Sequence, residues 1–403
     1  MGVFMETLFK KQERLLAQTS TDIVREIVKS IHWDHNLIGI RGSRGVGKTT
    51  LMRQYIKMNY PQGSREVLYC TLDSIYFSNH SLLELIESFY QQGGKRLFLD
   101  EVHKYETWSK ELKEANDLFP DLKIVFSGSS LLNILNADAD LSRRCLPYTM
   151  SGLSFREFLK FYKGIDVPVY KLEDILQNAG EICSEINRKC RPLQMFEEYL
   201  HAGYYPFFSG NREDYYINLE NVVNFILEQE MPLLCGVEPA YVRKLKALLG
   251  ILAASVPYEV DITRLATTIG ITRNSVISYL QSLGRAELLI LLYSDLLSVK
   301  KLQKPDKIYI QNTNLLFAIA SLPVQTGTVR ETFVVNQLSV VHDVEYGKNH
   351  GDFIVDGRYT FEVGGPDKTF KQIAGIPESY ILADKIEYAT GNKLPIWLVG
   401  LLY

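Results

Sequence analysis

The chain has 403 residues, of which 46% are hydrophobic and 23% charged, and its formal net charge is −3. This length predicts roughly two to four domains of a soluble protein, and the weak negative charge excludes an attraction for nucleic acid spread over the whole molecule. Five cysteines without a CxxC pair, and the lack of a signal-peptide pattern or of an apolar run of roughly 20 residues, predict a cytoplasmic protein with reduced thiols and no membrane contact.

The first part of the chain alternates between helices and short apolar strands. Residues 6–31 have a helical pattern, and they precede a strand at 37–40, a glycine-rich turn and a helix that ends before Pro61. The segments that follow are strands at 66–72, 96–101 and 122–128, and helices at 81–92 and near 108–119. Continuous apolar strands separated by helices indicate an α/β fold whose parallel sheet is covered on both faces.

The turn after the first strand, "RGSRGVGKTTL" at 41–51, matches the pattern G-x-x-x-x-G-K-[ST] between a strand and a helix. In such a loop, backbone N–H groups turn inward on phosphates at the positive end of the following helix. We expect Lys48 to reach the β- and γ-phosphates of ATP, and Thr49 to ligate Mg²⁺ through its hydroxyl. The expected nucleotide-binding residues are Gly42, Ser43, Arg44, Gly45, Val46, Gly47, Lys48, Thr49 and Thr50.

Two acids end the strand "RLFLDE" at 96–101. Asp100 is placed to hold the shell of the magnesium ion, and Glu101 is placed to polarise an attacking water as a general base. One further strand, at 66–72, separates this motif from the glycine-rich turn along the chain. This order is typical of P-loop ATPases with an inserted strand and a catalytic glutamate, as opposed to the kinase-like class.

Two later features have alternative interpretations. Ser127 or Ser129, in "IVFSGSS" at 124–130, either senses the γ-phosphate or caps a helix at 129–137, and both roles are compatible. Arg143 or Arg144, just past that helix, is either a finger that stabilises transition-state charge in a neighbouring subunit, or a residue of a surface ion pair or of a contact that joins domains. The first interpretation of the arginines implies a homo-oligomer.

These motifs, together with "LSRR" and "LSFREFL" (153–159), resemble those of the AAA+ superfamily. More closely, they are similar to a group of bacterial and archaeal ATPases with "GxRGVGKTT", "LDExH" and "GSS". The segment "AGYYP" at 202–206 is similar to a Gly-Gly-aromatic-Pro signature of the same proteins, with Ala202 in place of the first glycine. The resemblance implies an ATP-binding AAA+ core at 1–150 and a C-terminal part of largely undefined function.

Residues 151–255 are helical in pattern, and we expect them to be the helical lid that follows an AAA+ core. Nucleotide state would move such a lid relative to the core, because lids hinge on phosphate contacts. The aromatic stretch "YYPFF" at 204–208 is interpreted as core packing in preference to a platform for stacking bases.

Residues 256–322 are predicted to form a winged helix. Helices at 261–268 and 272–283 flank a turn at Gly270, and a basic turn between two strands supplies the wing. Its candidates for contact with nucleic acid are Arg273, Asn274, Ser278, Lys300, Lys301, Lys304 and Lys307. The alternative is a winged helix that binds protein and whose lysines are only solvated.

Residues 323–403 predict a small α/β domain, in which Glu331, Asp352 and Glu362 resemble the metal-binding carboxylates of a restriction-endonuclease-like core. Such a core normally carries Glu-x-Lys, whereas this chain has a glycine at the lysine position, Gly364. Either Lys368 or Lys371 would have to supply the amine. The missing lysine favours a degenerate domain used for docking over an active nuclease.

The sequence as a whole therefore predicts a multidomain AAA+-like ATPase that binds and hydrolyses ATP with Mg²⁺. Nucleotide state would be coupled to the winged helix and the nuclease-like tail. Three alternatives stay open: an ATP-controlled switch that binds nucleic acid, an ATP-gated metal-dependent nuclease, and a switch for a protein partner.

Overall fold

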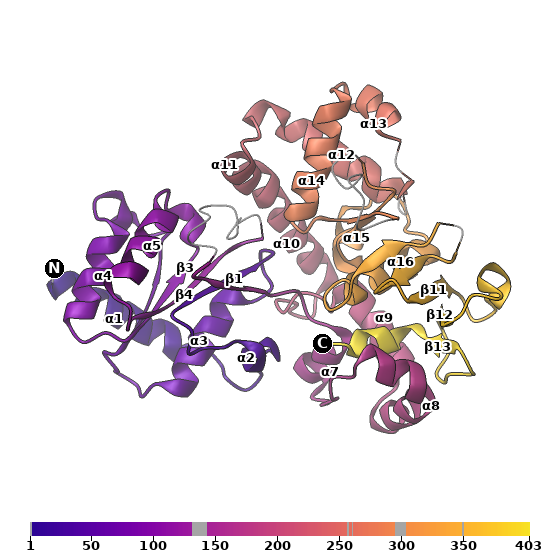
Figure 1. Ribbon diagram of the computed structural model, residues 1–403, viewed down its shortest axis with the longest axis horizontal. Helices are drawn as coiled ribbons and strands as arrows, with labels where there is room; N and C mark the ends of the chain where they lie inside the picture. Colours follow the sequence, from indigo (N-terminus) through magenta and orange to yellow (C-terminus); the bar gives the residue numbers. More distant parts are fainter. Residues whose placement is uncertain (1, 131–142, 256–257, 260, 295–303, 349) are drawn as a thin grey trace. The chain divides into compact units, whose positions relative to one another are not determined.

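A computed structural model of the chain describes residues 2–130, 143–255, 258–259, 261–294, 304–348 and 350–403. The chain divides into two compact units, Met1–Ser151 and Gly152–Tyr403. Figure 1 draws the first unit in indigo to purple and the second in magenta to yellow. The second unit spans the residues of the three C-terminal parts expected from the sequence, and the division into these parts stays a prediction.

The first unit is built on a parallel sheet of five strands in the order β2-β3-β4-β1-β5 (Figure 1). This architecture confirms the predicted α/β fold with a parallel sheet. The strands are β1 (Leu37–Gly42), β2 (Val67–Thr71), β3 (Arg96–Asp100), β4 (Lys123–Ser129) and β5 (Leu146–Thr149). The helices are α1 (Gly2–Ala17), α2 (Ile27–Ser30), α3 (Lys48–Asn59), α4 (Leu82–Gln91) and α5 (Trp108–Leu118), with 3₁₀ turns η1 (Ile75–Ser78) and η2 (Val102–Lys104).

The order of the strands adds a spatial detail to the sequence interpretation, in which the strand at 66–72 separates the two motifs along the chain. The strand that lies between β1 and β3 in the sheet is β4, whereas β2 lies at the edge, beyond β3. The chain reaches β2 first because a helical crossover allows a parallel strand to be placed away from its predecessor. The carboxyl ends of β1, β3 and β4 therefore lie side by side, and the first two carry the loop and the acid.

The single helix predicted at 6–31 is wrong, because α1 ends at Ala17 and α2 begins only at Ile27. The segment between them is held by α3, in which Gln54 Nε2 donates to the carbonyl oxygens of Ser20 at 2.8 Å and Ile23 at 2.9 Å. These two carbonyl oxygens accept hydrogen bonds from a side chain of α3 in place of the backbone N–H groups of a continuous helix. A tertiary contact therefore interrupts the helix that the sequence pattern predicts.

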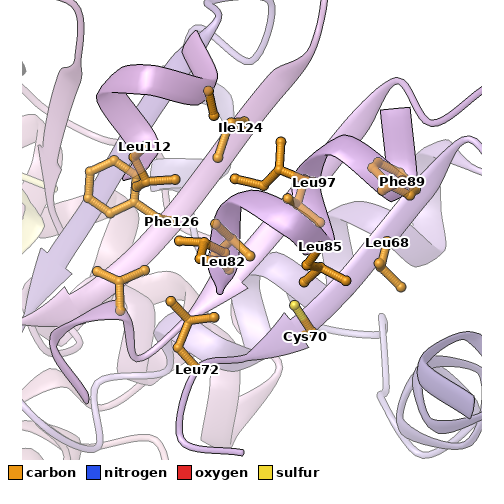
Figure 2. Packing of buried hydrophobic residues seen from close by; sticks show 14 of the residues in the cluster. Leu68, Cys70, Leu72, Leu82, Leu85, Phe89, Leu97, Leu112, Ile124 and Phe126 are labelled. Atoms are coloured by element: carbon orange, nitrogen blue, oxygen red, sulfur yellow. The ribbon is translucent and has the colours of Figure 1, made fainter. Parts of the chain in front are cut away.

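The main hydrophobic cluster covers one face of the sheet (Figure 2). Leu97 of β3 and Ile124 and Phe126 of β4 lie in it, together with apolar residues of α1, α4 and α5. The alternate residue of β3, Phe98, points to the other face, where its ring centroid lies 5.8 Å from that of Tyr55 on α3. Both faces of the sheet are therefore covered, as expected for strands that are apolar throughout.

A glutamine of α1 closes the exposed edge of the sheet. Gln12 Oε1 accepts the backbone N–H of Tyr69 at 2.5 Å, and its Nε2 donates to the carbonyl oxygen of Val67 at 3.2 Å. The side-chain amide thus pairs with β2 as a neighbouring strand would. Such a contact satisfies backbone groups that would otherwise invite pairing with another chain.

The second unit begins with a run of helices. They are α7 (Phe155–Lys163), α8 (Leu172–Lys189), α9 (Pro192–Ala202), α10 (Arg212–Phe225), the π-helical turn η3 (Ile226–Glu230), α11 (Met231–Cys235), η4 (Pro239–Tyr241) and α12 (Val242–Ser255). The first three pack against the C-terminal turn η7 (Ile396–Leu401), and α9 and α10 pack against α15 (Thr313–Ile319). The helices of the predicted lid thus share a core with the end of the chain.

A fully buried asparagine of α15 anchors the aromatic stretch after α9. Asn314 Oδ1 accepts the backbone N–H of Tyr204 at 2.8 Å and the hydroxyl of Tyr215 at 2.6 Å, while its Nδ2 donates to the carbonyl oxygen of Leu200 at 2.8 Å. Tyr204 and Tyr205 are buried. This burial confirms that these tyrosines are core residues and are not available for stacking on bases.

The middle of the second unit is a pair of helices beside a small antiparallel sheet in the order β6-β8-β7. Asp261 caps the first helix, Thr272 caps the second, and Gly270 between them has a left-handed φ of 69°. The elements are β6 (Tyr258–Glu259), α13 (Ile262–Ile269), α14 (Arg273–Arg285), β7 (Leu289–Leu292) and β8 (Lys307–Ile310). Lys300 and Lys301 of the predicted wing lie outside the described residues.

The last part of the chain forms a mixed sheet in the order β13-β12-β11-β10-β9. Strand β10 is antiparallel to both of its neighbours, β9 and β11, whereas β11, β12 and β13 run parallel. The elements are α16 (Thr326–Leu338), β9 (Val344–Tyr346), β10 (Phe353–Val355), β11 (Tyr359–Gly364), η6 (Phe370–Ile373), β12 (Ser379–Ala383) and β13 (Lys393–Pro395). Within the described part of the chain, every helix is too short or too polar to cross a membrane.

Candidate nucleotide-binding site

The glycine-rich loop joins the end of β1 to the start of α3, as the sequence predicts. Gly45 and Gly47 have φ angles of 89° and 104°, in the left-handed region that side chains rarely adopt. A Cβ on Gly42 would lie 2.2 Å from the carbonyl oxygen of Met150. The three glycines of the motif are therefore required by backbone conformation at two positions and by close packing at the third.

Lys48 lies within the loop. Its Nζ donates to the carbonyl oxygens of Gly42 at 2.7 Å and Ser43 at 2.9 Å, and the residue is buried. The ammonium group is thus held beside the first residues of the loop by hydrogen bonds to their backbone oxygens. Of the other predicted loop residues, Arg44 and Thr50 are exposed, and Val46 is buried beneath the loop.

Asp100, at the end of β3, accepts hydrogen bonds from side chains of α3, β2 and β4. Its Oδ2 accepts the hydroxyl of Thr49 at 2.7 Å and the hydroxyl of Tyr69 at 2.6 Å, and its Oδ1 accepts the hydroxyl of Ser127. Asp100 is 3% exposed. The structure thus brings together Thr49, Asp100 and Ser127, which the sequence predicts separately, and its three hydroxyl donors fix the direction of the carboxylate.

Tyr69 and Arg53 are members of this cluster that the sequence interpretation missed. Arg53 of α3 donates from Nη2 to the Tyr69 hydroxyl at 2.9 Å, and its guanidinium lies 4.9 Å from the centroid of the tyrosine ring. Burial, and then the charge of Asp100, raise the pKa of Tyr69 well above its usual value. Tyr69 therefore stays a neutral donor to the carboxylate.

The oxygens of Thr49 and Asp100 fit a magnesium ion. Mg²⁺ prefers hard oxygen ligands and is usually held by one or two protein groups plus phosphates and water. The hydroxyl of Thr49 and the carboxylate of Asp100 are already in contact at the edge of the glycine-rich loop. The described residues therefore supply the kind of partial shell that Mg²⁺ takes in nucleotide complexes.

Glu101 has an unusual backbone conformation. Its φ of 57° and ψ of 43° lie in the left-handed region, and its N–H donates to Ser127 Oγ at 3.2 Å. Burial raises the pKa of its carboxyl group above the usual value, while the nearby charge of Lys48 lowers it. The side chain keeps 27% of its surface exposed, so it is accessible to water.

His103 lies beside Glu101 and was also missed. Its Nε2 is 3.5 Å from Glu101 Oε2, and its Nδ1 accepts the backbone N–H of Ser129 at 3.4 Å. The side chain is 1% exposed. The sequence signal was available, because this histidine is the last residue of the "LDExH" motif, but its spacing alone does not show what it contacts.

The remaining residues predicted near this site lie in two situations. Ser127 and Ser129 are both buried at the end of β4, whereas the helix that Ser129 was expected to cap lies mostly outside the described residues. Arg144 forms a two-pronged ion pair with Asp117, with contacts of 3.0 and 3.2 Å. Arg143 is exposed.

The second predicted site, in the C-terminal sheet, contains both acids and lysines. Glu331 Oε2 accepts Lys307 Nζ at 2.9 Å and the hydroxyl of Tyr309 at 2.6 Å. Glu362 forms an ion pair with Lys368, whereas Lys371 is exposed on η6. The predicted amine from the following segment is thus Lys368.

Asp352 is the third acid of this cluster. Its Oδ2 accepts the backbone N–H of Val363 at 2.8 Å. Burial, with a further contribution from the charge of Glu331, raises the pKa of Asp352 to about 6. Among the described residues, no group of three acids, histidines or cysteines is arranged to hold a metal ion.

The outward face of α14 carries the predicted contacts for nucleic acid. Arg273, Asn274 and Ser278 are exposed, and Arg273 Nη1 donates to Thr263 Oγ1 at 2.8 Å. The expectation for Lys307 is wrong, because this lysine is buried and paired with Glu331. An acid 24 residues away in the sequence withdraws it from the surface.

Comparison with known proteins finds two matching families. The family described as "AAA domain" matches residues 34–159, and a "Domain of unknown function (DUF8612)" matches residues 193–326. The first match covers β1, the glycine-rich loop, Asp100 and Glu101. Together with the parallel sheet and the loop geometry, this match supports a AAA-type P-loop domain at residues 34–159. The description of the second family names no activity.

Individual relatives add little about function. Two uncharacterized proteins of Methanocaldococcus jannaschii are 27% and 25% identical to the chain, over 355 and 314 residues. The alignments cover 84% and 74% of this chain but 72% and 65% of those proteins, so the chain spans less than two thirds of the second relative. A solved structure of C. elegans PCH-2 aligns with 70% of this chain and 68% of its own, at 12% identity. The TM-score of this alignment is 0.25, which is too low to show a shared fold.

Proposed function

We propose that the chain binds ATP with Mg²⁺ at the loop after β1 and hydrolyses it, with Glu101 as the general base. The observation that carries this proposal is the 2.7 Å contact between Thr49 and Asp100 beside the buried amine of Lys48. Three groups that serve phosphate and magnesium thus converge from two separate motifs. The match of residues 34–159 to the "AAA domain" family supports the same activity.

Each group has a distinct role in binding. The phosphates of ATP replace the carbonyl oxygens of Gly42 and Ser43 as partners of Lys48, and the N–H groups of the loop bind the same phosphates. Thr49 and Asp100 hold the Mg²⁺ that accompanies ATP and offsets the charge of its phosphates. Tyr69 and Ser127 keep the Asp100 carboxylate directed at that position.

Hydrolysis then requires a water molecule in line with the γ-phosphate. The water oxygen bonds to the γ-phosphorus while the bond from phosphorus to the β–γ bridging oxygen breaks, and the proton of the water passes to the Glu101 carboxylate. ADP and inorganic phosphate leave, and Glu101 returns the proton to solvent. A carboxylate with a raised pKa is a stronger base for this transfer than an ordinary surface glutamate.

The arginine finger is assigned to Arg143. Arg144 is engaged by Asp117 within its own unit, whereas Arg143 is exposed at the same turn. An exposed arginine is able to reach the phosphates of a neighbouring subunit, which makes a homo-oligomer part of the proposal. A mass measurement with and without ATP tests this part, because a monomer in both conditions excludes a finger supplied by another subunit.

The second unit is proposed to respond to nucleotide state. Helices α13 and α14, followed by the antiparallel pair β7 and β8, have the element order of a winged helix. The exposed residues Arg273 and Asn274 support contact with nucleic acid, whereas the burial of Lys307 lowers the positive charge expected on the wing.

A metal-dependent nuclease stays as a second candidate because of one observation. Glu362 Oε2 is buried and has no hydrogen-bond partner among the described residues, so one oxygen of this acid is available to a ligand. Against this, Lys307 and Lys368 already neutralise two of the three acids. Incubation of plasmid and RNA with Mg²⁺ or Mn²⁺ decides the matter: cleavage that is lost in Glu362→Ala supports the nuclease, and intact substrate supports a degenerate domain.

The main proposal is tested by an ATPase assay with and without DNA and RNA. Release of phosphate that requires Mg²⁺ and is lost in Lys48→Ala supports it, and stimulation by one nucleic acid names the partner class. Absence of turnover and of ATP binding in the folded wild-type protein contradicts it.

A further inference from the structure

We infer that His103 is a positioning residue that fixes the Glu101 carboxylate and ties it to the end of β4. This inference rests on the proposed hydrolysis of ATP and deepens it, because it adds a residue on which the general base depends. Neither the family matches nor the motif pattern assigns a role to this histidine.

The position of His103 follows from the turn after β3. The turn η2 (Val102–Lys104) folds the chain back immediately after Glu101, so the side chains of residues 101 and 103 lie on the same side of the turn. The imidazole is 1% exposed, whereas the Glu101 carboxylate is 27% exposed. The ring is thus the buried support of a carboxylate that faces water.

The contacts of the ring fix its tautomer. Nδ1 accepts the N–H of Ser129, so in a neutral ring this nitrogen carries no proton. The proton is then on Nε2, which lies 3.5 Å from Glu101 Oε2. This separation is long for a hydrogen bond, and contacts of catalytic groups often tighten only when substrate is bound.

The backbone of Glu101 needs the same support. A non-glycine residue with φ of 57° persists only where its surroundings impose that conformation. Here the Oγ of Ser127 accepts the Glu101 N–H, and His103 joins the Glu101 carboxylate to the N–H of Ser129. The backbone N–H of Glu101 is therefore held by β4 directly, and its carboxylate is linked to β4 through His103. This is the strand whose hydroxyl residues were expected to sense the γ-phosphate.

A function follows from this arrangement. A general base must be held within hydrogen-bond reach of the water from which it takes a proton, and a small misplacement lowers the rate. The alternative is that His103 only fills the core beneath η2, in which case the shape of the side chain matters and its Nε2–H does not.

Three substitutions at one position separate these roles. The amide of glutamine extends as far as Nε2 of histidine and offers a donor there, whereas the amide of asparagine extends only as far as Nδ1. His103→Gln therefore preserves the contact with Glu101, His103→Asn preserves the contact with Ser129, and His103→Ala preserves neither. The full-length protein is used for each variant, with kcat and KM for ATP measured alongside the Kd of a fluorescent ATP analogue.

We expect His103→Ala to lower kcat by about 10- to 100-fold while KM and Kd change by less than about threefold. His103→Gln recovers most of the lost kcat, and His103→Asn does not. In a Glu101→Gln background, His103→Ala causes no further loss of kcat, because the carboxylate on which it acts is already absent.

Three results overturn the inference. They are a wild-type kcat in His103→Ala, equal recovery by asparagine and glutamine, and a full additional loss in the Glu101→Gln background. If His103→Ala does not fold, the comparison of the glutamine and asparagine variants still decides. The proposed function fails separately: it fails if Glu101→Gln alone retains wild-type turnover, whereas a block in Glu101→Gln with normal turnover in His103→Ala removes only this inference.

Discussion

Thr49 Oγ1 donates a hydrogen bond to Asp100 Oδ2 at 2.7 Å, and this contact joins the start of α3 to the end of β3. The two residues are 51 positions apart in the chain. The same carboxylate also accepts hydroxyl groups from β2 and β4. The proposed magnesium site is therefore assembled by side chains of α3 and of three neighbouring strands.

Replacing Thr49 by alanine removes a proposed magnesium ligand. We expect Thr49→Ala to raise the Mg²⁺ concentration needed for half-maximal ATPase activity by about tenfold or more, since Mg²⁺ has few protein ligands in such sites. Thr49→Ser keeps the hydroxyl and is the matched control. Equal Mg²⁺ dependence in the alanine and serine variants excludes Thr49 as a ligand.

Tyr69→Phe removes one hydroxyl donor from Asp100 and leaves the ring in place. We expect a weaker effect in the same Mg²⁺ titration, of up to about tenfold, because residues that orient a metal ligand contribute to its affinity. The residue lies on β2, away from the glycine-rich loop, so the Kd for ATP without Mg²⁺ should stay unchanged. A loss of ATP affinity in the absence of Mg²⁺ contradicts this role.

The exposed face of α14 distinguishes partner classes. If the partner is nucleic acid, the chain binds duplex DNA or RNA at low salt. The double variant of Arg273→Ala on α14 and Lys304→Ala on the predicted wing then weakens binding by about tenfold. Lys189→Ala, an exposed lysine on α8, removes a charge elsewhere in the same unit and serves as control. Absence of binding at low salt leaves a protein partner as the remaining class.

Asp352 predicts a pH dependence of stability in the second unit. Its pKa in the folded chain is about 6, above its usual value, so the unfolded chain releases a proton that the folded chain retains. Stability is therefore lost as pH rises from about 4 to 6 and stays reduced above that range. We expect Asp352→Asn to increase the free energy of unfolding at pH 7.5 by about 1–3 kcal/mol, with a smaller gain as pH falls toward about 4.

Urea unfolding followed by Trp397 fluorescence measures this effect, because Trp397 is fully buried in the second unit. The other tryptophans, Trp33 and Trp108, are changed to phenylalanine in every variant so that only this unit is observed. Asp367→Asn, at an exposed acid of the same unit, is the control and should change stability by less than about 0.5 kcal/mol. A variant at Asp352 that is less stable than the reference protein at pH 7.5 contradicts the assignment.

The predictable part of the site is the part encoded in contiguous sequence. The loop at 41–51 and the acids that end β3 were identified because glycine positions and strand ends are visible in the sequence itself. Tyr69 was not, because its hydroxyl reaches Asp100 only where β2 and β3 are neighbours in the sheet. His103 is close to Glu101 in sequence, but its contact with Ser129 depends on β4.

The same reason explains the errors in the fold. The helical pattern of residues 6–31 is real, but Gln54 of α3 binds the backbone of the segment that separates α1 from α2. Lys307 has the sequence context of a surface turn, yet Glu331 on α16 draws it into the protein. In both cases a side chain distant in sequence competes successfully with a local preference.

The central claim is that Glu101 is the base for hydrolysis of ATP held by Lys48, Thr49 and Asp100. A single-turnover experiment with ATP bound to the wild type, Glu101→Gln and Lys48→Ala tests it most directly. We expect Lys48→Ala to lose ATP binding. We expect Glu101→Gln to bind ATP within about threefold of the wild type, and to release phosphate at a rate that is lower by a factor of about 100 or more. Release of phosphate by Glu101→Gln at the wild-type rate contradicts the account.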